Sequence, residues 1–409
     1  MSELSLQPSA IGPDAPQALP LVIVGAGLAA WTVARELRKL DTQRRIVMLS
    51  SDSADFYAKP TLSNALAQKR SAEQLVTTPA AKMAETLQVQ LLSHSRALSL
   101  DTVARTLSYE DALGQPQQLR YADLVLATGA DPIRLPMAGS AAAQVQSINH
   151  LQDLARFHEA LGALPKTVLV IGAGLIGCEF ANDLLLGGYR VHVVDPSPRP
   201  LALLLPAAAG EQLQEALQGQ GVAWHLGTTV QSLDADASSG RLRATLADGS
   251  HLQVDAVLSA VGLRANTALA GAAGMACERG IVVDAHLQTS AAHVYALGDC
   301  AQYASAGARV LPYVMPIMNA AKALAATLAG QTTELVFPLM PVAVKTPALP
   351  IVVAAPHPSL SGQWTQDEGV EPGTGGAWRF VDEAGHQRGF VLTGKQSSRR
   401  MELAKATML

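Results

Sequence analysis

The chain has 409 residues, of which 49% are hydrophobic, 16% charged and 4% aromatic, and its formal net charge is −4. This length predicts two or three domains, because one hydrophobic core stops growing well before it. The scarcity of aromatic residues and the small negative charge exclude a stacking surface for single-stranded nucleic acid and a broadly basic nucleic-acid interface.

We expect the start of the chain to form a tail rather than a signal peptide. Residues 1–18 have neither a basic region nor an apolar core and predict a flexible tail. The longest apolar stretch, 21–34, is too short to span a bilayer. Cys178, Cys277 and Cys300 are far apart in the sequence, and no histidine cluster is present, which favours a reducing compartment and no metal. We therefore expect a cytoplasmic protein without a membrane segment.

Two segments repeat the same pattern of strand, glycine turn, helix and strand, namely 19–50 and 166–195. The turns read G-x-G-x-x-A and G-x-G-x-x-G, formed by Gly25, Gly27 and Ala30 and by Gly172, Gly174 and Gly177. The first glycine allows the turn, the second lets a pyrophosphate approach the backbone, and the third small residue lets the helix pack on the strand. Two copies in this context predict two dinucleotide-binding domains, against the alternative of glycine turns without a ligand.

The residues that end the second strand of each repeat differ. Asp195 lies 18 residues after Gly177, where a carboxylate accepts from a ribose 2′-hydroxyl and repels a 2′-phosphate, so NADH is favoured over NADPH. The nearby Arg199 could accommodate that phosphate, which leaves the strictness of this choice open. In the first repeat the strand ends at Ser50 and Ser51, which either contact a ribose or form an ordinary turn.

The rest of the chain completes the fold prediction. Segments of alternating polarity follow each repeat, 317–330 predicts a helix ending at a glycine, and proline-rich strands begin at about 331. We predict an α/β fold with two Rossmann-like doubly wound domains and a small C-terminal α+β domain. The predicted boundaries are 19–130 with 258–330 for the first, 131–257 for the second and 331–409 for the third.

Further motifs resemble a known family. The segments YADLVLATGADPIRLP (121–136), SAVGLRANT (259–267) and TSAAHVYALGDCA (289–301) resemble motifs of two-dinucleotide flavoprotein reductases. The segments FYAKPTLSNAL (56–66), YVMPIM (313–318) and MPVAVKTPALPIVV (340–353) narrow the resemblance to the rubredoxin reductases, over nearly all of 20–409. Those enzymes hold FAD tightly but non-covalently and pass electrons from NADH to rubredoxin, so the resemblance implies FAD in the first domain and NADH in the second.

The resemblance also implies site residues. It places FAD contacts on Gly25, Ala26, Gly27, Leu28, Ala29, Ser50, Ser51, Lys59, Ala97, Glu179, Asp299, Val314 and Lys345, with Arg134 near the FAD pyrophosphate. NADH contacts fall on Gly172, Gly174, Gly177 and Asp195.

Two of these residues are the predicted catalytic pair. By resemblance, Lys59 and Glu179 meet beside the flavin where nicotinamide docks, and an ammonium partner makes a buried carboxylate tolerable. The alternatives are a solvent-facing Glu179, a surface Lys59 before a proline turn, and a Lys345 that extends to the surface.

No thiol stands where related enzymes carry one. Disulfide reductases have two cysteines near the flavin and peroxide reductases have one after the Y-x-R segment, whereas 57–70 has none. Cys178 and Cys300 are predicted to be buried structural thiols. Electrons are therefore expected to leave the flavin directly for a one-electron iron carrier.

The resulting interpretation is a monomeric NADH:rubredoxin oxidoreductase that feeds an oxygenase or an oxidative-stress pathway. Its small acidic partner is expected to dock transiently on positive charge, for which 35–45 and 394–405 are the basic candidates. One alternative is an NADH-dependent ferredoxin reductase of a monooxygenase or dioxygenase system. The other is a flavin-binding redox sensor with slow catalytic turnover. A peroxide- or oxygen-reducing enzyme is disfavoured by the missing cysteine.

Overall fold

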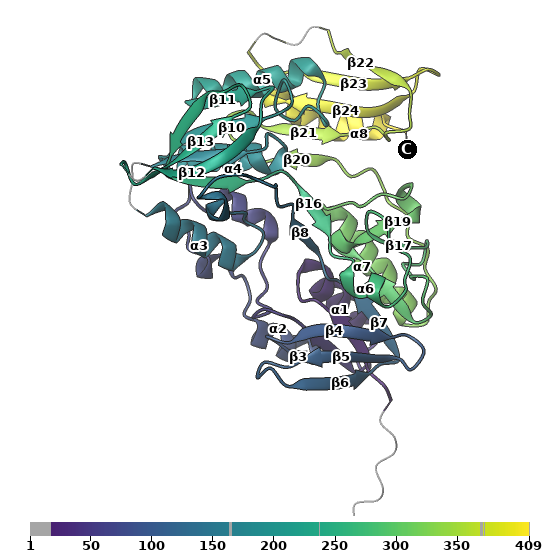
Figure 1. Ribbon diagram of the computed structural model, residues 1–409. Helices are drawn as coiled ribbons and strands as arrows, with labels where there is room; N and C mark the ends of the chain where they lie inside the picture. Colours follow the sequence, from purple (N-terminus) through teal and green to yellow (C-terminus); the bar gives the residue numbers. More distant parts are fainter. Residues whose placement is uncertain (1–17, 163–165, 237, 369–370, 372, 409) are drawn as a thin grey trace, which may run out of the picture.

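The computed structural model describes residues 18–162, 166–236, 238–368, 371 and 373–408. The predicted tail therefore lies outside the described residues, apart from residue 18. Three units are visible in Figure 1: a lower nucleotide-binding domain, an upper one, and a C-terminal sheet beside the upper one. This arrangement matches the predicted fold class.

The first domain is built on a five-stranded parallel sheet. Its strand order is β18 (Val294–Ala296), β7 (Asp123–Leu126), β1 (Leu21–Val24), β2 (Ile46–Leu49) and β3 (Val89–Leu92). The central strands are continuous apolar runs because both faces of a parallel sheet are covered. Two helices, α1 (Leu28–Leu40) and α7 (Val314–Leu328), lie side by side in this domain.

Smaller elements surround this sheet. They are α2 (Ala80–Leu87), α6 (Ala268–Ala272), the ribbon β4 (Arg96–Asp101), β5 (Thr106–Glu110) and β6 (Pro116–Arg120), the pair β17 (Ile281–Val283) and β19 (Ala301–Tyr303), and the 3₁₀ turns η1 (Lys59–Asn64), η2 (Glu73–Leu75), η4 (Gly298–Cys300) and η5 (Ala304–Ala306). The helix predicted over 317–330 is α7, which begins three residues earlier and is followed by Gly330 with a φ of +90°.

The second domain repeats the design with a parallel sheet of four strands. The order is β11 (Val222–Leu226), β10 (Arg190–Asp195), β9 (Thr167–Ile171) and β15 (Ala256–Ser259). Its helices are α3 (Leu151–Leu161), α4 (Leu175–Leu186) and α5 (Ala207–Gly219), and it adds η3 (Ala142–Gln144) and an antiparallel sheet of β12 (Val230–Asp236), β13 (Arg241–Leu246) and β14 (His251–Val254).

One predicted domain boundary needs correction. The division between residues 257 and 258 falls inside β15, which pairs in register with β9, so the second domain continues through Ser259. The chain crosses between the two domains at β8 (Ala130–Pro132) and β16 (Leu263–Ala265), which pair with each other as an antiparallel ribbon. Both crossings are thus tied together, as Figure 1 shows between the two sheets.

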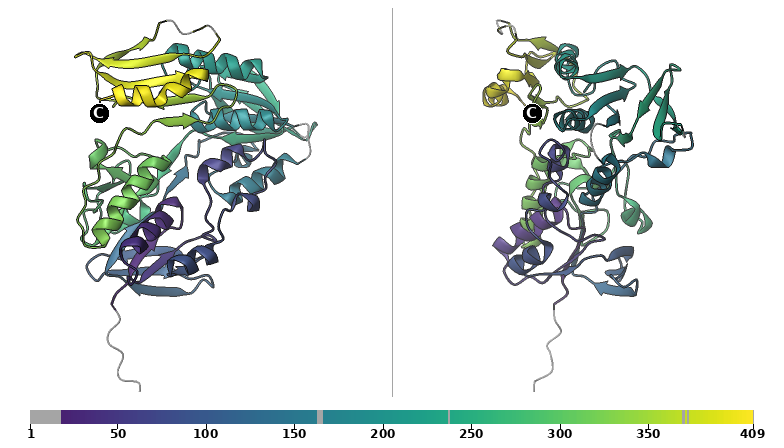
Figure 2. Two further views of the ribbon diagram at one scale, coloured as in Figure 1. Left: turned by 180° about the vertical axis from the view of Figure 1, so that it is seen from behind. Right: turned by 90° about the vertical axis from the view of Figure 1, so that its left-hand side faces the viewer.

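The third domain is an antiparallel sheet with one helix. Its strand order is β20 (Val342–Val344), β21 (Ile351–Ala354), β24 (Gln387–Thr393), β23 (Ala377–Asp382) and β22 (Gly362–Gln366), followed by η6 (Gly394–Arg399) and α8 (Arg400–Ala406). Successive residues of β21 face opposite ways: Ile351 and Val353 join the core of the second domain, whereas Val352 packs with Leu403 of α8. The helix α8 therefore lies on the face away from the second domain (Figure 2).

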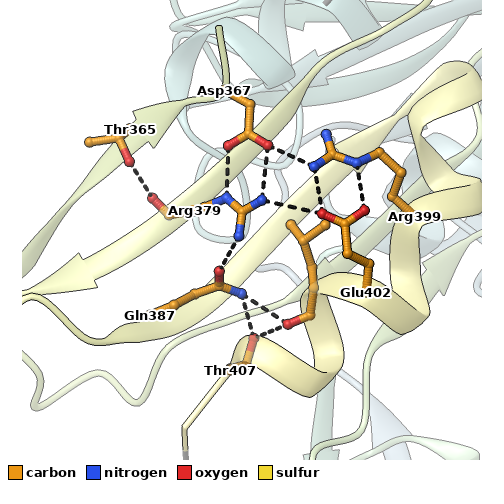
Figure 3. Close-up of polar contacts among 8 residues, drawn as sticks. Thr365, Asp367, Arg379, Gln387, Arg399, Glu402 and Thr407 are labelled. Atoms are coloured by element: carbon orange, nitrogen blue, oxygen red, sulfur yellow. Dashed lines mark hydrogen bonds and ion pairs between the residues drawn. The ribbon is translucent and has the colours of Figure 1, made fainter.

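A network of charged side chains fixes α8 to this sheet (Figure 3). Arg379 donates to Asp367 at 2.8 Å, and Arg399 donates to Asp367 at 3.0 Å and to Glu402 at 2.8 Å. Arg399 of the basic segment 394–405 is therefore engaged in ion pairs within the third domain.

The described part of the chain contains no helix that combines the length and the apolar character needed to cross a membrane. Among the same residues, no group of three or more His, Cys, Asp or Glu side chains could hold a metal ion.

Candidate functional site

A cleft of ≈ 2400 Å³ opens between the three domains. Both glycine turns, η1, the start of α7 and the segment around Lys345 line it. Sites for one small ligand usually measure roughly 300–1,000 Å³. The cleft therefore has room for more than one large ligand.

The first glycine of each turn is required by the backbone. Gly25 has a φ of +110° and Gly172 a φ of +107°, a region that residues with a side chain rarely adopt. An added Cβ would lie 2.2 Å from the carbonyl oxygen of Ala127 at Gly25 and 2.7 Å from that of Ala260 at Gly172. Both turns thus pass against the end of a neighbouring strand, as the motif predicts.

The second glycine of each turn opens toward the cleft. Gly27 and Gly174 line it, and a Cβ at either position would meet nothing within 4 Å. They begin α1 and α4, and neither helix has a side-chain cap or an acidic residue in its first turn. The first N–H groups of both helices are therefore available to an anion, which fits a pyrophosphate in each cradle.

The third position of the second motif serves packing. Gly177 does not line the cleft, and a Cβ there would lie 1.9 Å from the carbonyl oxygen of Gly172. This is the close helix–strand approach that the motif predicts, so Gly177 shapes the turn without facing a ligand.

Asp195 lies at the cleft with its carboxylate held in place. It accepts the N–H groups of Ala173 and Ser197, each at 2.7 Å. Arg199 does not line the cleft, and its side chain packs where Gly210 leaves room, since a Cβ there would lie 3.1 Å from its Cδ. This arrangement presents a carboxylate rather than a cation to the ribose and supports selection of NADH.

The corresponding position in the first domain is a hydrogen-bonded turn at the cleft. Ser50, Ser51 and Asp52 line the cleft, and the Ser50 hydroxyl donates to Asp52 at 2.6 Å. Asp52 also accepts the N–H of Ala54 at 2.9 Å. The predicted turn at the serine pair is therefore present, and it lies in the wall of the cleft, where the predicted contact with a ribose stays a prediction.

Glu179 is 1% exposed and fully partnered. Its carboxylate accepts the Ser63 hydroxyl at 2.7 Å and the backbone N–H of Lys345 at 2.9 Å, and pairs with the Lys345 ammonium at 2.6 Å. That ammonium also donates to the Pro60 carbonyl and to Ser63, each at 2.6 Å. Three acceptors match the three N–H bonds of the ammonium, so the half-buried Lys345 compensates the buried carboxylate with all its donors used.

The predicted pairing of Lys59 with Glu179 is wrong in this structure. Lys59 begins η1 and lies 3.7 Å from the Asp299 carboxylate, whereas Glu179 takes Lys345 from the third domain as its cation. The turn of η1 brings Ser63, rather than Lys59, to α4. Burial raises the pKa of Asp299, and the Lys59 charge opposes that rise. All four charged residues still line the same cleft.

The same face of α4 binds the neighbouring domains. Asp183, one turn after Glu179, accepts the N–H groups of Leu66 at 3.0 Å and Ala67 at 2.9 Å. Burial raises the pKa of the Asp183 carboxyl to about 6, against the opposing effect of these two hydrogen bonds. Sequence reasoning missed Ser63 and Asp183. The polar residues of the otherwise apolar helix 175–186 were the available signal for Asp183.

The remaining predicted residues divide into two groups. Those that line the cleft are Ala26, Leu28, Ala29, Ala97 and Val314. Arg134 is exposed and is not among the lining residues, so the structure does not bring it to the site.

The cysteines are placed as predicted. Cys178 and Cys300 are fully buried, and burial raises the pKa of both thiols. Their sulfur atoms contact backbone carbonyls, and no cysteine is among the described residues that line the cleft. These thiols are therefore structural and cannot form a relay.

Two glycine cradles that open into one cleft, with the Glu179–Lys345 ion pair in its wall, are the arrangement of a two-dinucleotide oxidoreductase. The chain belongs to the pyridine nucleotide-disulphide oxidoreductase family, which it matches over residues 19–326. Residues 334–407 match the rubredoxin binding C-terminal domain.

Relatives align over almost the whole chain. A rubredoxin-NAD(+) reductase from Acinetobacter baylyi is 42% identical over 94% of this chain and 97% of its own. A nitric oxide reductase FlRd-NAD(+) reductase from Aeromonas hydrophila is 38% identical over 96% of this chain and 97% of its own. The ferredoxin reductase of the CYP199A2 system from Rhodopseudomonas palustris superposes with a TM-score of 0.84 and 26% identity, over 95% of each chain.

Proposed function

We propose that this protein is an FAD-dependent reductase that takes hydride from NADH and passes single electrons to rubredoxin. The observation that carries the proposal is the contact of Lys345 with Glu179 in the nucleotide cleft. Lys345 belongs to the segment that matches the rubredoxin binding domain, and Glu179 belongs to the second nucleotide-binding domain. The carrier-binding domain thus supplies part of the cleft wall.

Different residues of the chain would bind each of the two nucleotides. FAD, when bound, accepts an electron pair as hydride and releases electrons one at a time. The Gly25 turn and the start of α1 would hold its pyrophosphate, with Asp299 and Lys59 farther along the cleft. The Gly172 turn and Asp195 would orient NADH so that nicotinamide lies beside the reacting ring.

The ion pair has a defined task in this arrangement. Glu179 and Lys345 would fix the wall of the nicotinamide position, because neither can rotate without losing a buried partner. Positive charge from lysine would also stabilise negative charge that develops in the cleft during reduction.

We propose that the carrier docks where α7 begins and the third domain meets the cleft. Val314 and Met315 are exposed there, and His357 and Met408 line the cleft from the third domain. The basic segments suggested by the sequence are less suited. Arg38 of segment 35–45 donates to four backbone carbonyls within its own domain, and neither segment lines the cleft.

The identity of the carrier is tested with the purified holoenzyme. Cytochrome c reduction by NADH would be followed with either rubredoxin or a ferredoxin as the intermediate carrier. We expect the faster turnover with rubredoxin. Faster turnover with ferredoxin would favour the second candidate, an NADH-dependent ferredoxin reductase, which the similarity to the CYP199A2-system reductase supports.

We also propose a monomer that binds its carrier transiently in the cytoplasm and serves an oxygenase or an oxidative-stress pathway. All three cysteines are free thiols, as a reducing compartment leaves them. Light scattering after size-exclusion chromatography would test the monomer. Steady-state NADH oxidation that fails to respond to any carrier would favour a redox sensor instead.

A further inference from the structure

Ser63 occupies an unusual place in the cleft wall. Its hydroxyl accepts a hydrogen bond from the Lys345 ammonium at 2.6 Å and donates one to the Glu179 carboxylate at 2.7 Å. A hydroxyl has one hydrogen to donate, and two acceptors lie within reach: the Glu179 carboxylate at 2.7 Å and the Pro60 carbonyl at 3.3 Å. The carboxylate is nearer and charged, so it is the stronger acceptor for that hydrogen. Ser63 is 3% exposed and lines the cleft with both charged residues.

The three groups restrict the carboxylate at both oxygens. One oxygen of Glu179 accepts the backbone N–H of Lys345, and the other accepts the Ser63 hydroxyl and lies against the Lys345 ammonium. Without Ser63 the second oxygen would keep one donor and gain room to move. Each oxygen would then have a single donor, the backbone N–H of Lys345 on one and its ammonium on the other.

The backbone holds Ser63 at this point from both sides. Within η1, Ser63 departs from helical geometry, with a φ of −86° and a ψ of 17°. Before it, the Pro60 carbonyl accepts the Lys345 ammonium. After it, the N–H groups of Leu66 and Ala67 donate to Asp183, one turn along the same helix as Glu179. The hydroxyl is thus positioned by contacts to two other domains.

We propose that Ser63 is a positioning residue for hydride transfer: it fixes the Glu179 carboxylate in the cleft by bridging it to Lys345. The inference rests on the proposed reduction of bound FAD by NADH, and it adds a residue that acts through Glu179 rather than on the nucleotide. It predicts that removal of the hydroxyl slows hydride transfer but leaves NADH affinity nearly unchanged.

The test measures flavin bleaching by NADH in a stopped-flow instrument, with the holoenzyme and a range of NADH concentrations. For Ser63→Ala we expect a limiting rate roughly fivefold to tenfold lower, the effect of losing about one net hydrogen bond of ordinary strength, with the Kd for NADH within about twofold. Ser63→Cys keeps the shape of the side chain with a larger and weakly donating sulfur atom, so it should slow the reaction similarly even if the alanine variant folds poorly.

A double-mutant cycle separates positioning from a general structural effect. In a Glu179→Gln background, Ser63→Ala should lower the rate much less than in the wild type, because the carboxylate it positions is gone. Thr289→Val provides a matched control: Thr289 is buried and hydrogen-bonded but does not line the cleft. It should lower the melting temperature without changing the limiting rate.

Two results would overturn the inference. The first is an unchanged limiting rate in both Ser63 variants, and the second is an equal loss of rate with and without Glu179. Failure of the wild-type holoenzyme to bleach with NADH would instead count against the proposed function, so the two failures are distinguishable.

Discussion

The Lys345 ammonium lies 2.6 Å from the Glu179 carboxylate, although the two residues are 166 positions apart and belong to different domains. This contact makes the third domain part of the nucleotide cleft. It also corrects the predicted choice of lysine: Lys345, not Lys59, pairs with the buried Glu179, and Lys59 makes a longer contact of 3.7 Å with Asp299.

The first prediction compares these lysines. Lys345→Met leaves the 1% exposed Glu179 charge without its cation and should lower the free energy of unfolding by about 3 kcal/mol or more. Lys59→Met should cost at most about 1 kcal/mol, because its side chain is 37% exposed and 3.7 Å from its partner. Chemical denaturation of both variants measures this, with Lys395→Met as an exposed control in the third domain. An equal loss of unfolding free energy in the two variants would contradict this prediction and favour the pairing of Lys59 with Glu179.

The second prediction uses the glycines of the NADH turn. Gly174→Ala should leave the melting temperature unchanged, because its φ is −74° and nothing lies within 4 Å of the added Cβ. That methyl group would point into the cleft, so we expect the Kd for NADH to rise about tenfold or more, a change of about 1.4 kcal/mol. The NADH concentration dependence of flavin bleaching in the holoenzyme and thermal unfolding give the two readouts.

A matched control for this prediction is Gly219→Ala, at the end of α5, where a Cβ also meets nothing within 4 Å. It should change neither the affinity nor the fold. Gly172→Ala should behave differently and unfold the domain, because the residue has a φ of +107° and its Cβ would lie 2.7 Å from the Ala260 carbonyl. If Gly174→Ala binds NADH as tightly as the wild type, the turn that begins at Gly172 does not contact NADH.

Much of the fold could be predicted because its signals are local. The closing strand of the repeat predicted over 19–50 is β2 at 46–49, and that of the repeat predicted over 166–195 is β10 at 190–195. Apolar runs, glycine turns and helix periodicity depend on neighbouring residues, so one sequence suffices to read them. The boundary at 257 failed because β15 pairs with β9, and strand pairing across about 90 residues has no local signal.

The site was less predictable for a related reason. The residues of the cleft were mostly identified, but the partner of Glu179 depends on how the third domain docks. That docking is set by Trp378 and Val391, which enter the core of the second domain. No spacing in the sequence encodes such a contact, and it decides which lysine reaches α4.

The third prediction concerns pH. Burial raises the pKa of Asp183 to about 6 from an ordinary value of 3.8, so between these values the folded state binds more protons than the unfolded state. The contribution of Asp183 to the free energy of unfolding is therefore fully present below about pH 4. It falls as the pH rises from about 4 to about 6, and it does not change further above about pH 6. The shift corresponds to about 3 kcal/mol at most.

Asp183→Asn should remove this pH dependence. Urea unfolding at pH 4.5, 5.5 and 7 would measure the difference in unfolding free energy between the wild type and the variant. We expect the unfolding free energy of the wild type to fall relative to that of Asp183→Asn as the pH rises from 4.5 to 7. A difference that stays constant would show that folding does not shift the pKa of this carboxyl, and one that moves in the opposite direction would show that folding lowers it; either result contradicts the prediction. Asp248→Asn, at an exposed turn, is the control.

The last prediction places the carrier. Met315 is 53% exposed at the start of α7, beside the cleft, and Met401 is 64% exposed on α8 within the basic segment 394–405. Met315→Glu puts a negative charge where we propose that an acidic carrier docks, so like-charge repulsion and the loss of apolar contact should lower kcat/KM for rubredoxin about tenfold. Stopped-flow reduction by NADH alone should stay unchanged, since the substitution acts only on the outgoing step.

Met401→Glu introduces the same charge on the same type of side chain, away from the cleft, and should leave kcat/KM within about twofold. The reverse pattern, with Met401→Glu impaired and Met315→Glu normal, would move the docking surface to α8, because only a partner seated there would sense that charge.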